Sequence, residues 1–198
     1  MTPELLAEIQ KTLAFNYDGT DSLREQQKRH EILDYAKNYG CDTLIETGTN
    51  RGDTVEATRL FFDNVYSIEV GPNIYEAAVR RFAGIDNVHL LLGDAREVLP
   101  ELLKNLPSNN VIFYLDAHCQ YDDASPEGKA EGTSVLFEIK AIIDNCHDSV
   151  VLIDDARLFS HEYNAKWPEL TEFLRSIEVA CPWWNIELKD DLIRLTPR

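Results

Sequence analysis

The chain has 198 residues, of which 44% are hydrophobic and 27% are charged, and its formal net charge is −16 at pH 7. This length allows one domain with a sizeable core and is short for two. The strong negative charge argues against nucleic-acid and anionic-membrane partners, because its long-range field repels phosphate. No apolar stretch reaches transmembrane length, so we expect no membrane-spanning segment.

The cysteines and the first residues indicate a compartment. The four cysteines lie far apart and include no Cys-x-x-Cys pair for zinc or redox chemistry. The chain does not start with the basic residues and apolar run of a secretory signal. We therefore expect a cytoplasmic protein whose thiols are reduced and mostly buried.

Residues 1–40 are predicted to form an N-terminal helical cap on a single domain that spans residues 1–198. A first helix begins at Thr2-Pro3. Ser22 and Glu25 are spaced as in a capping box and open a long polar helix that stops at Gly40. We expect these helices to cover a sheet edge, and a contribution to a lid or a homodimer surface is the alternative.

Strands and helices alternate through the predicted core, residues 43–198. Strands are predicted at residues 43–46, 65–70, 88–92, 111–116 and 150–154, and helices at residues 53–62, 74–82, 97–103, 135–145 and 168–177. The end of the chain is predicted to be an antiparallel hairpin of residues 184–188 and 192–195. Five strand–helix units and a hairpin predict an α/β fold with a doubly wound seven-stranded sheet.

A glycine-containing turn follows the first predicted strand. The run from Glu46 to Gly52 is an acid, two glycines and polar residues between a strand and a helix. Such turns bring backbone N–H groups close to a ligand, since glycine has no Cβ to collide with it. The dinucleotide fingerprint requires glycines at positions 48, 50 and 53, but Asn50 and Asp53 occupy the last two.

The spacing acid-x-Gly-x-x-x-Gly instead resembles the first motif of class I S-adenosylmethionine (SAM) dependent methyltransferases. The resemblance implies the Rossmann-like methyltransferase fold and SAM as the cofactor. It implies that the methionine portion of SAM is held by Glu46, Thr47, Gly48, Thr49, Asn50 and Gly52. Glu69 ends the second strand, where a carboxylate can accept hydrogen bonds from both ribose hydroxyls. Asp94 and Ala95 follow the third strand, where they either lie near adenine or Asp94 caps the next helix.

Acidic residues also end the fourth and fifth predicted strands. Asp116 and His118 end one strand, and Asp154 and Asp155 end the other. Neighbouring parallel strands bring these ends together, so the three carboxylates repel one another unless a proton or a cation lies among them. Oxygen ligands suit a hard divalent ion such as Mg²⁺. The alternative is that the carboxylates only cap turns and bond to backbone amides.

Together these motifs resemble the macrocin O-methyltransferase group, which are metal-dependent enzymes that methylate hydroxyls of sugars and related natural products. The resemblance covers about residues 43–160. It implies that Asp116, Asp154 and Asp155 bind the metal and that His118 is the general base. The expected substrate is a small hydroxylated molecule, with a sugar or glycoside as one candidate.

Other residues near these strand ends are candidates for the substrate pocket. Residues 120–132 are predicted to be a long loop, either a lid or an insertion. Four side chains after the fifth strand could line the pocket, although packing or surface roles are favoured for them: Arg157, His161, Tyr163 and Trp167.

The leading hypothesis is thus a Mg²⁺-dependent, SAM-dependent O-methyltransferase. The alternatives are a metal-independent methyltransferase, a SAM-binding protein without turnover, and an NAD-linked oxidoreductase, against which the incomplete fingerprint argues.

Overall fold

The computed structural model describes residues 23–116, 134–146, 148–159 and 167–198. Its strands are β1 (Thr43–Thr47), β2 (Asn64–Glu69), β3 (Val88–Leu92), β4 (Val111–Leu115), β5 (Val150–Ile153), β6 (Trp184–Lys189) and β7 (Leu192–Pro197). Its helices are α2 (Leu23–Tyr39), α3 (Asp53–Thr58), α4 (Pro72–Arg81), α5 (Ala95–Leu103), α6 (Val135–Asn145), a 3₁₀ turn η1 (Ala156–Leu158) and α7 (Leu170–Ala180). The first predicted helix and the loop 120–132 lie outside the described residues.

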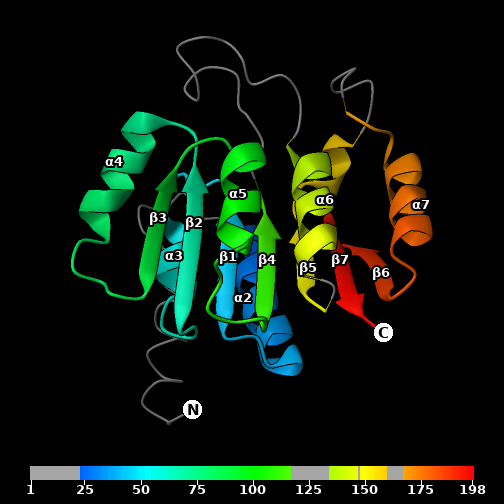
Figure 1. Ribbon diagram of the computed structural model, residues 1–198, viewed down its shortest axis with the longest axis horizontal. Coiled ribbons are helices and arrows are strands. Elements are labelled where there is room, and N and C mark those ends of the chain that lie inside the picture. The colour runs from blue at the N-terminus through cyan, green and yellow to red at the C-terminus, as the bar shows by residue number, and fades with distance from the viewer. Residues whose placement is uncertain (1–22, 117–133, 147, 160–166) are drawn as a thin grey trace.

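The seven strands form one sheet in the order β3-β2-β1-β4-β5-β7-β6 (Figure 1). Strands β1 to β5 are parallel, and β7 runs antiparallel to both β5 and β6. The predicted doubly wound sheet with a C-terminal antiparallel hairpin is confirmed. The chain winds outward in both directions from β1 and β4, so the crevice at the carboxyl ends of these two strands is where such sheets bind ligands.

The hairpin turn has a local cause. Asp190 and Asp191 separate β6 from β7 and have φ angles of 50° and 63°. Two successive residues with positive φ form the type I′ turn, whose twist matches that of the flanking antiparallel strands. Aspartate is among the few residues that tolerate this conformation.

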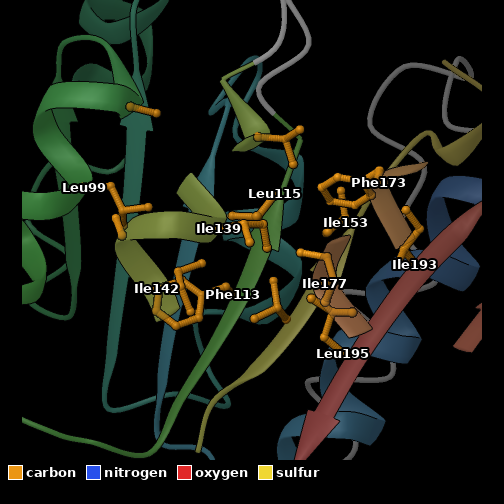
Figure 2. Close-up of a cluster of buried hydrophobic side chains, with 14 of the residues drawn as sticks. Leu99, Phe113, Leu115, Ile139, Ile142, Ile153, Phe173, Ile177, Ile193 and Leu195 are labelled. Atoms are coloured by element: carbon orange, nitrogen blue, oxygen red, sulfur yellow. The ribbon is translucent and has the colours of Figure 1, made fainter. Parts of the chain in front are cut away.

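Two cores lie on the two faces of the sheet. One contains side chains of α5, α6 and α7 packed on β4, β5 and β7, and Figure 2 shows Leu99, Phe113, Ile139 and Phe173 among them. The other contains side chains of α2, α3 and α4. Every residue of β4 and β5 is buried, as expected for strands covered on both faces. Alternation along β4 turns Tyr114 toward the face that α2 covers.

The position of α2 differs from the prediction. The helix has the predicted bounds and ends before Gly40, whose φ is 69°. It contacts β4 and β5 in the middle of the sheet, however, and the expectation that it covers a sheet edge is wrong. The reason is a short apolar stripe, Ile32, Leu33 and Ala36, which is buried with strand side chains inside an otherwise polar helix.

Several helix bounds differ from the prediction, most of all the C-terminal ends of two helices. Helix α3 ends at Thr58 and not at residue 62, because the N–H of Phe61 donates to the carbonyl of Thr58 in a tight turn that buries Phe62. Helix α7 continues beyond Ile177 to Ala180. Among the described residues, no helix has both the length and the apolar character that crossing a membrane requires.

Candidate functional site

The turn between β1 and α3 has the backbone that its glycines predict. The φ angles of Gly48, Asn50 and Gly52 are 89°, 48° and 77°, so three residues of this short turn are left-handed. Asparagine tolerates this conformation better than most residues, which explains how Asn50 takes a position where glycine is usual in the resembling motif. The N–H of Gly48 donates to the carbonyl of Ile68 and thereby fixes the turn to β2.

We expect Gly52→Ala to lower the free energy of unfolding by about 2–4 kcal/mol, because strain and overpacking combine. A Cβ at Gly52 would lie 2.6 Å from Cε2 of Phe82, in a residue whose φ is 77°. Gly84→Ala is the matched control, since Gly84 has a φ of 79° and its Cβ would meet nothing within 4 Å. Urea denaturation measures both variants, and equal losses would contradict the role of the Phe82 contact.

Glu69, at the end of β2, holds the turn in place. Its Oε2 accepts a hydrogen bond of 3.0 Å from the N–H of Asn50, and its Oε1 accepts one of 2.8 Å from the N–H of Gly71. The carboxylate is buried, and each of its oxygens has a second lone pair for a further donor. The predicted contact with ribose hydroxyls stays a prediction, but Glu69 lies beside the turn as that contact requires.

Asp94 caps helix α5. Its carboxylate accepts a hydrogen bond of 2.9 Å from the N–H of Arg96 and forms an ion pair with the Arg96 guanidinium. These hydrogen bonds and the positive charge of Arg96 outweigh partial burial and lower the pKa of Asp94. The capping alternative is therefore confirmed, and the contact of Asp94 and Ala95 with adenine stays a prediction.

Glu46 lies at the floor of the turn and is buried. Ser67 Oγ donates to Glu46 Oε2 at 2.7 Å, and Ser67 Oγ lies 2.7 Å from Thr49 Oγ1. Burial raises the pKa of Glu46 to about 8, the Ser67 hydrogen bond opposes this shift, and the charge of Asp116 adds to it. Glu46 is consequently mostly a neutral acid at pH 7, which sequence reasoning did not anticipate.

The fit of these residues to SAM can be judged from their chemistry. Three residues of the turn have left-handed backbone conformations, and the carboxylate of Glu69 lies at the end of β2. The hydroxyl of Thr47 is buried at the base of the turn and has no hydrogen-bond partner within the described part of the chain. A buried hydroxyl without a partner is unfavourable and favours a site that a polar ligand completes. The residues fit the cofactor.

The ends of β4 and β5 are also brought together, as predicted. The N–H of Asp116 donates to the carbonyl of Thr47, and the N–H of Asp154 donates to the carbonyl of Leu115. Asp154 is 1% exposed, whereas Asp116 is partly exposed. His118, the expected general base, lies outside the described residues, as do His161 and Tyr163 of the expected substrate pocket.

Asp154 has partners that the sequence analysis did not identify. Its Oδ2 lies 2.6 Å from Nζ of Lys28 on helix α2 and accepts a hydrogen bond of 2.6 Å from the hydroxyl of Tyr114. Its Oδ1 accepts a hydrogen bond of 2.6 Å from the N–H of Asp155. Burial and the charges of Asp116 and Asp154 raise the pKa of Tyr114 well above its usual value, so the phenol stays neutral and donates its proton.

Asp155 is held by a second basic residue. The guanidinium of Arg157 forms ion pairs with Asp155 and with Asp191 in the β6–β7 turn. Asp155 has a φ of 54°, and it precedes the 3₁₀ turn η1. Arg157 therefore ties the end of β5 to the hairpin. Trp167, another expected pocket residue, is buried against Phe159 in the core, in line with the favoured packing role.

The predicted metal ligands do not fit a divalent ion as they are arranged. Among the described residues, no three His, Cys, Asp or Glu side chains gather as a metal site requires. Two of the three predicted ligands, Asp154 and Asp155, are paired with basic side chains. A cation does lie near these acids, as their mutual repulsion requires. In this structure that cation is the ammonium of Lys28.

Lys28, Tyr114 and Ser67 are the site residues that sequence reasoning missed. Lys28 lies in a run of polar residues on a predicted solvated helix, and Tyr114 and Ser67 lie inside apolar strands. The one available signal was the alternation of side chains between the two faces of a strand. Glu46 on β1 pairs with Ser67 on β2 and with Tyr114 on β4, so the three side chains lie on the same face of the sheet.

No protein-family model matches this sequence, and no curated protein matches it. Solved structures do match over nearly the whole chain. The methyltransferase PaMTH1 of Podospora anserina, with S-adenosylhomocysteine (SAH) bound, is 14% identical with a TM-score of 0.61, covering 100% of this chain and 89% of that one. The O-methyltransferase from Bacillus cereus, in complex with SAH, is 14% identical with a TM-score of 0.62, covering 99% and 92%.

A third similar structure is the O-methyltransferase TomG of Streptomyces achromogenes, involved in tomaymycin synthesis and solved with SAM. It is 14% identical with a TM-score of 0.59, covering 100% of this chain and 92% of that one. At this identity the likeness defines the fold, and function has to be argued from the site. The chain has the Rossmann-like fold of class I methyltransferases.

Proposed function

We propose that this protein is a SAM-dependent O-methyltransferase that acts on a hydroxyl group of a small molecule. The observation that carries the proposal is the left-handed turn of Gly48, Asn50 and Gly52, tied to Glu69 at the carboxyl ends of β1 and β2. This combination lies in a fold shared with methyltransferases solved with SAM or SAH. When bound, SAM would supply a methyl group already activated by its positive sulfur.

Each cofactor-binding residue has a proposed role. The turn residues would approach the methionine portion through their backbone, because Gly48 carries no Cβ that could collide with it. Glu69 would accept hydrogen bonds from the ribose hydroxyls, and Asp94 with Ala95 would border adenine. The hydroxyl of Thr47, buried at the base of the turn, would gain a partner in this arrangement.

The proposed reaction is an in-line displacement, and alignment supplies much of its rate. The acceptor oxygen would receive the methyl group that SAM supplies, SAM would leave as SAH, and the hydroxyl proton would go to a base. We propose His118 as that base and Asp116 as the neighbouring carboxylate that orients it or the acceptor. The sugar or glycoside acceptor and the Mg²⁺ ion rest on the resemblance to the macrocin group alone, and no step here depends on the ion.

The remaining assignments are also proposals. We propose a small hydroxylated substrate, no nucleic-acid partner and a cytoplasmic location, with a homodimer as an option. The net charge of −16 supports the exclusion of nucleic acid. Cys41, Cys146 and Cys181 are free thiols, in keeping with a reducing compartment.

The test of the proposed function is SAH binding measured by titration calorimetry. Wild-type protein is expected to bind SAH and not NAD. Glu69→Ala is expected to weaken SAH binding by about 1.5–3 kcal/mol, because charge-assisted hydrogen bonds to ribose are lost. Glu76→Ala, which removes a carboxylate whose side chain is 69% exposed on α4, serves as the control and should bind SAH normally.

Two results would contradict this assignment. Unchanged SAH affinity in a folded Glu69→Ala variant would remove Glu69 from the ribose site. Absence of SAH binding to the wild type would refute the proposed function itself. Transfer of labelled methyl groups from SAM to a panel of hydroxylated acceptors then separates an enzyme from a SAM-binding protein without turnover.

A further inference from the structure

A buried cation lies at the acidic ends of β4 and β5, and its role in catalysis rests on the proposed function. Helix α2, blue in Figure 1, lies on the face of the sheet behind β4 and contacts β4 and β5. Lys28 reaches from this helix to the strand ends, and its side chain is only 7% exposed. A lysine this buried requires charged or polar partners, because an unpaired ammonium is strongly destabilising away from water.

Lys28 has such partners on both sides. Its Nζ lies 2.6 Å from Asp154 Oδ2, 3.1 Å from Glu25 Oε1 and 3.7 Å from Asp155 Oδ1. Its ammonium donates hydrogen bonds to the carboxylates of Asp154 and Glu25, and these contacts favour its charged form. The side chain therefore carries a full positive charge among three carboxylates.

The hydrogen bonds of Asp154 leave little room for a metal ion. A carboxylate offers about two lone pairs on each oxygen. Oδ2 uses both, one for Lys28 and one for Tyr114, and Oδ1 uses one for the N–H of Asp155. A Mg²⁺ ion binds oxygens at about 2.0–2.1 Å and would have to displace the ammonium or the phenol. It would also repel the positive charge of Lys28 at short range.

We infer that the ammonium of Lys28 is the permanent cation of this site, in the place where the resemblance to the macrocin group implies a divalent metal. Lys28 is a positioning residue: it holds Asp154, which in turn accepts from Tyr114 and fixes the end of β5 beside Asp116. The methyl transfer proposed above then needs no divalent ion at Asp154. Helix α2 therefore supplies part of the site, which its polar sequence alone does not indicate.

The experiment measures Mn²⁺ binding to the full chain by the electron paramagnetic resonance signal of free Mn²⁺. Wild-type protein is expected to bind no Mn²⁺ at Asp154. Lys28→Ala removes the ammonium and leaves the carboxylates, so it is expected to bind Mn²⁺ at least about tenfold more tightly than wild type. Mn²⁺ should also raise the melting temperature of this variant by mass action. The gain should disappear when Asp154→Asn is added.

Lys140→Ala is the matched control, because Lys140 forms an ion pair with Asp144 at 2.7 Å but its side chain is 75% exposed. It should bind Mn²⁺ as wild type does. Lys28→Met, which keeps the aliphatic stem, replaces Lys28→Ala if the smaller side chain prevents folding. The wild-type measurement does not depend on either variant.

The inference is overturned if wild-type protein binds Mn²⁺ and Asp154→Asn abolishes that binding. It is equally overturned if the folded Lys28 variants bind Mn²⁺ no better than wild type does, since the ammonium would then not be what keeps the metal out. SAH calorimetry on the same samples keeps the two proposals separate. Loss of SAH binding in wild type refutes the proposed function, whereas the Mn²⁺ results address Lys28 alone.

Discussion

Glu46→Gln is expected to stabilise the protein increasingly as the pH rises from about 4.5 to about 8. In the unfolded chain Glu46 loses its proton near its ordinary pKa of 4.5, whereas the folded protein retains the proton until about pH 8. The folded state therefore binds more protons across this window, and the contribution of Glu46 to stability falls as the pH rises. The slope is about 1.4 kcal/mol per pH unit for one group, so the whole effect between pH 4.5 and about pH 8 is about 5 kcal/mol. Glutamine has the same shape as glutamate and carries no charge. The free energy of unfolding of Glu46→Gln therefore does not fall in this way as the pH rises.

Urea denaturation of both proteins at several values between pH 5 and pH 9 measures this difference. The two should be nearly equally stable at pH 5, and the variant should be clearly more stable at pH 9. The groups that face Glu46 are Ser67, Thr54, Asp116 and Glu69, and all of them remain in the variant. Glu101→Gln, on the exposed side of α5, is the control and should follow wild type. Parallel curves for Glu46→Gln and wild type would show that the buried acid is not protonated when the protein is folded.

Lys28→Met is expected to lower the free energy of unfolding by about 3–5 kcal/mol at pH 7, because it leaves the buried carboxylate of Asp154 without its cation. Asp154 is 1% exposed, so water cannot replace the ammonium without opening the contact between α2 and the sheet. The loss should appear as a lower urea midpoint. The far-ultraviolet circular dichroism of the folded variant should be unchanged.

Two further variants test whether the loss of stability comes from the burial of the Lys28–Asp154 ion pair. Lys140→Met breaks a pair of nearly the same length, 2.7 Å, on the surface, and should lose less than about 1 kcal/mol. Lys28→Met combined with Asp154→Asn removes both charges, and the amide remains a polar partner for Tyr114 and for the N–H of Asp155. This double variant should recover most of the lost stability. Equal losses for Lys28→Met and Lys140→Met would mean that the Lys28 pair behaves as an exposed one.

Much of the fold could be predicted from the sequence because its strands differ from its helices in period and length. The run from Val111 to Leu115 is continuously apolar and buried on both faces, and the helix at Val135–Asn145 has its predicted bounds. The end of α3 could not be predicted, because Phe61 and Phe62 continue its apolar pattern and only the hydrogen bond from Phe61 to Thr58 ends the helix. Helix ends depend on such local contacts, which the pattern does not contain.

The candidate site also contains residues that could be predicted from the sequence and residues that could not. Glu46, Gly48, Gly52 and Glu69 could be found because they are close to strand ends, where the fold alone brings them together. Lys28 could not, since it acts on a residue 126 positions later in the chain. The charge balance at Asp154 and Asp155 required a cation, but the balance does not specify whether the cation is a metal ion or a side chain.

The place of β7 in the sheet has a consequence for protein synthesis. During translation β7 is the last strand of this sheet to be made, yet it lies between β5 and β6 and pairs with both. Until residues 192–197 leave the ribosome, the hydrogen-bonding edge of β5 is bare, although every residue of β5 is apolar and buried in the finished protein. An unpaired apolar edge of this kind recruits other strands and promotes aggregation.

Nascent chains that stall between β5 and β7 are therefore expected to be prone to aggregation. Strands β1 to β5 have been made by then, whereas β7, the antiparallel partner of β5, has not. A chaperone that covers the bare edge of β5 would reduce aggregation at that stage.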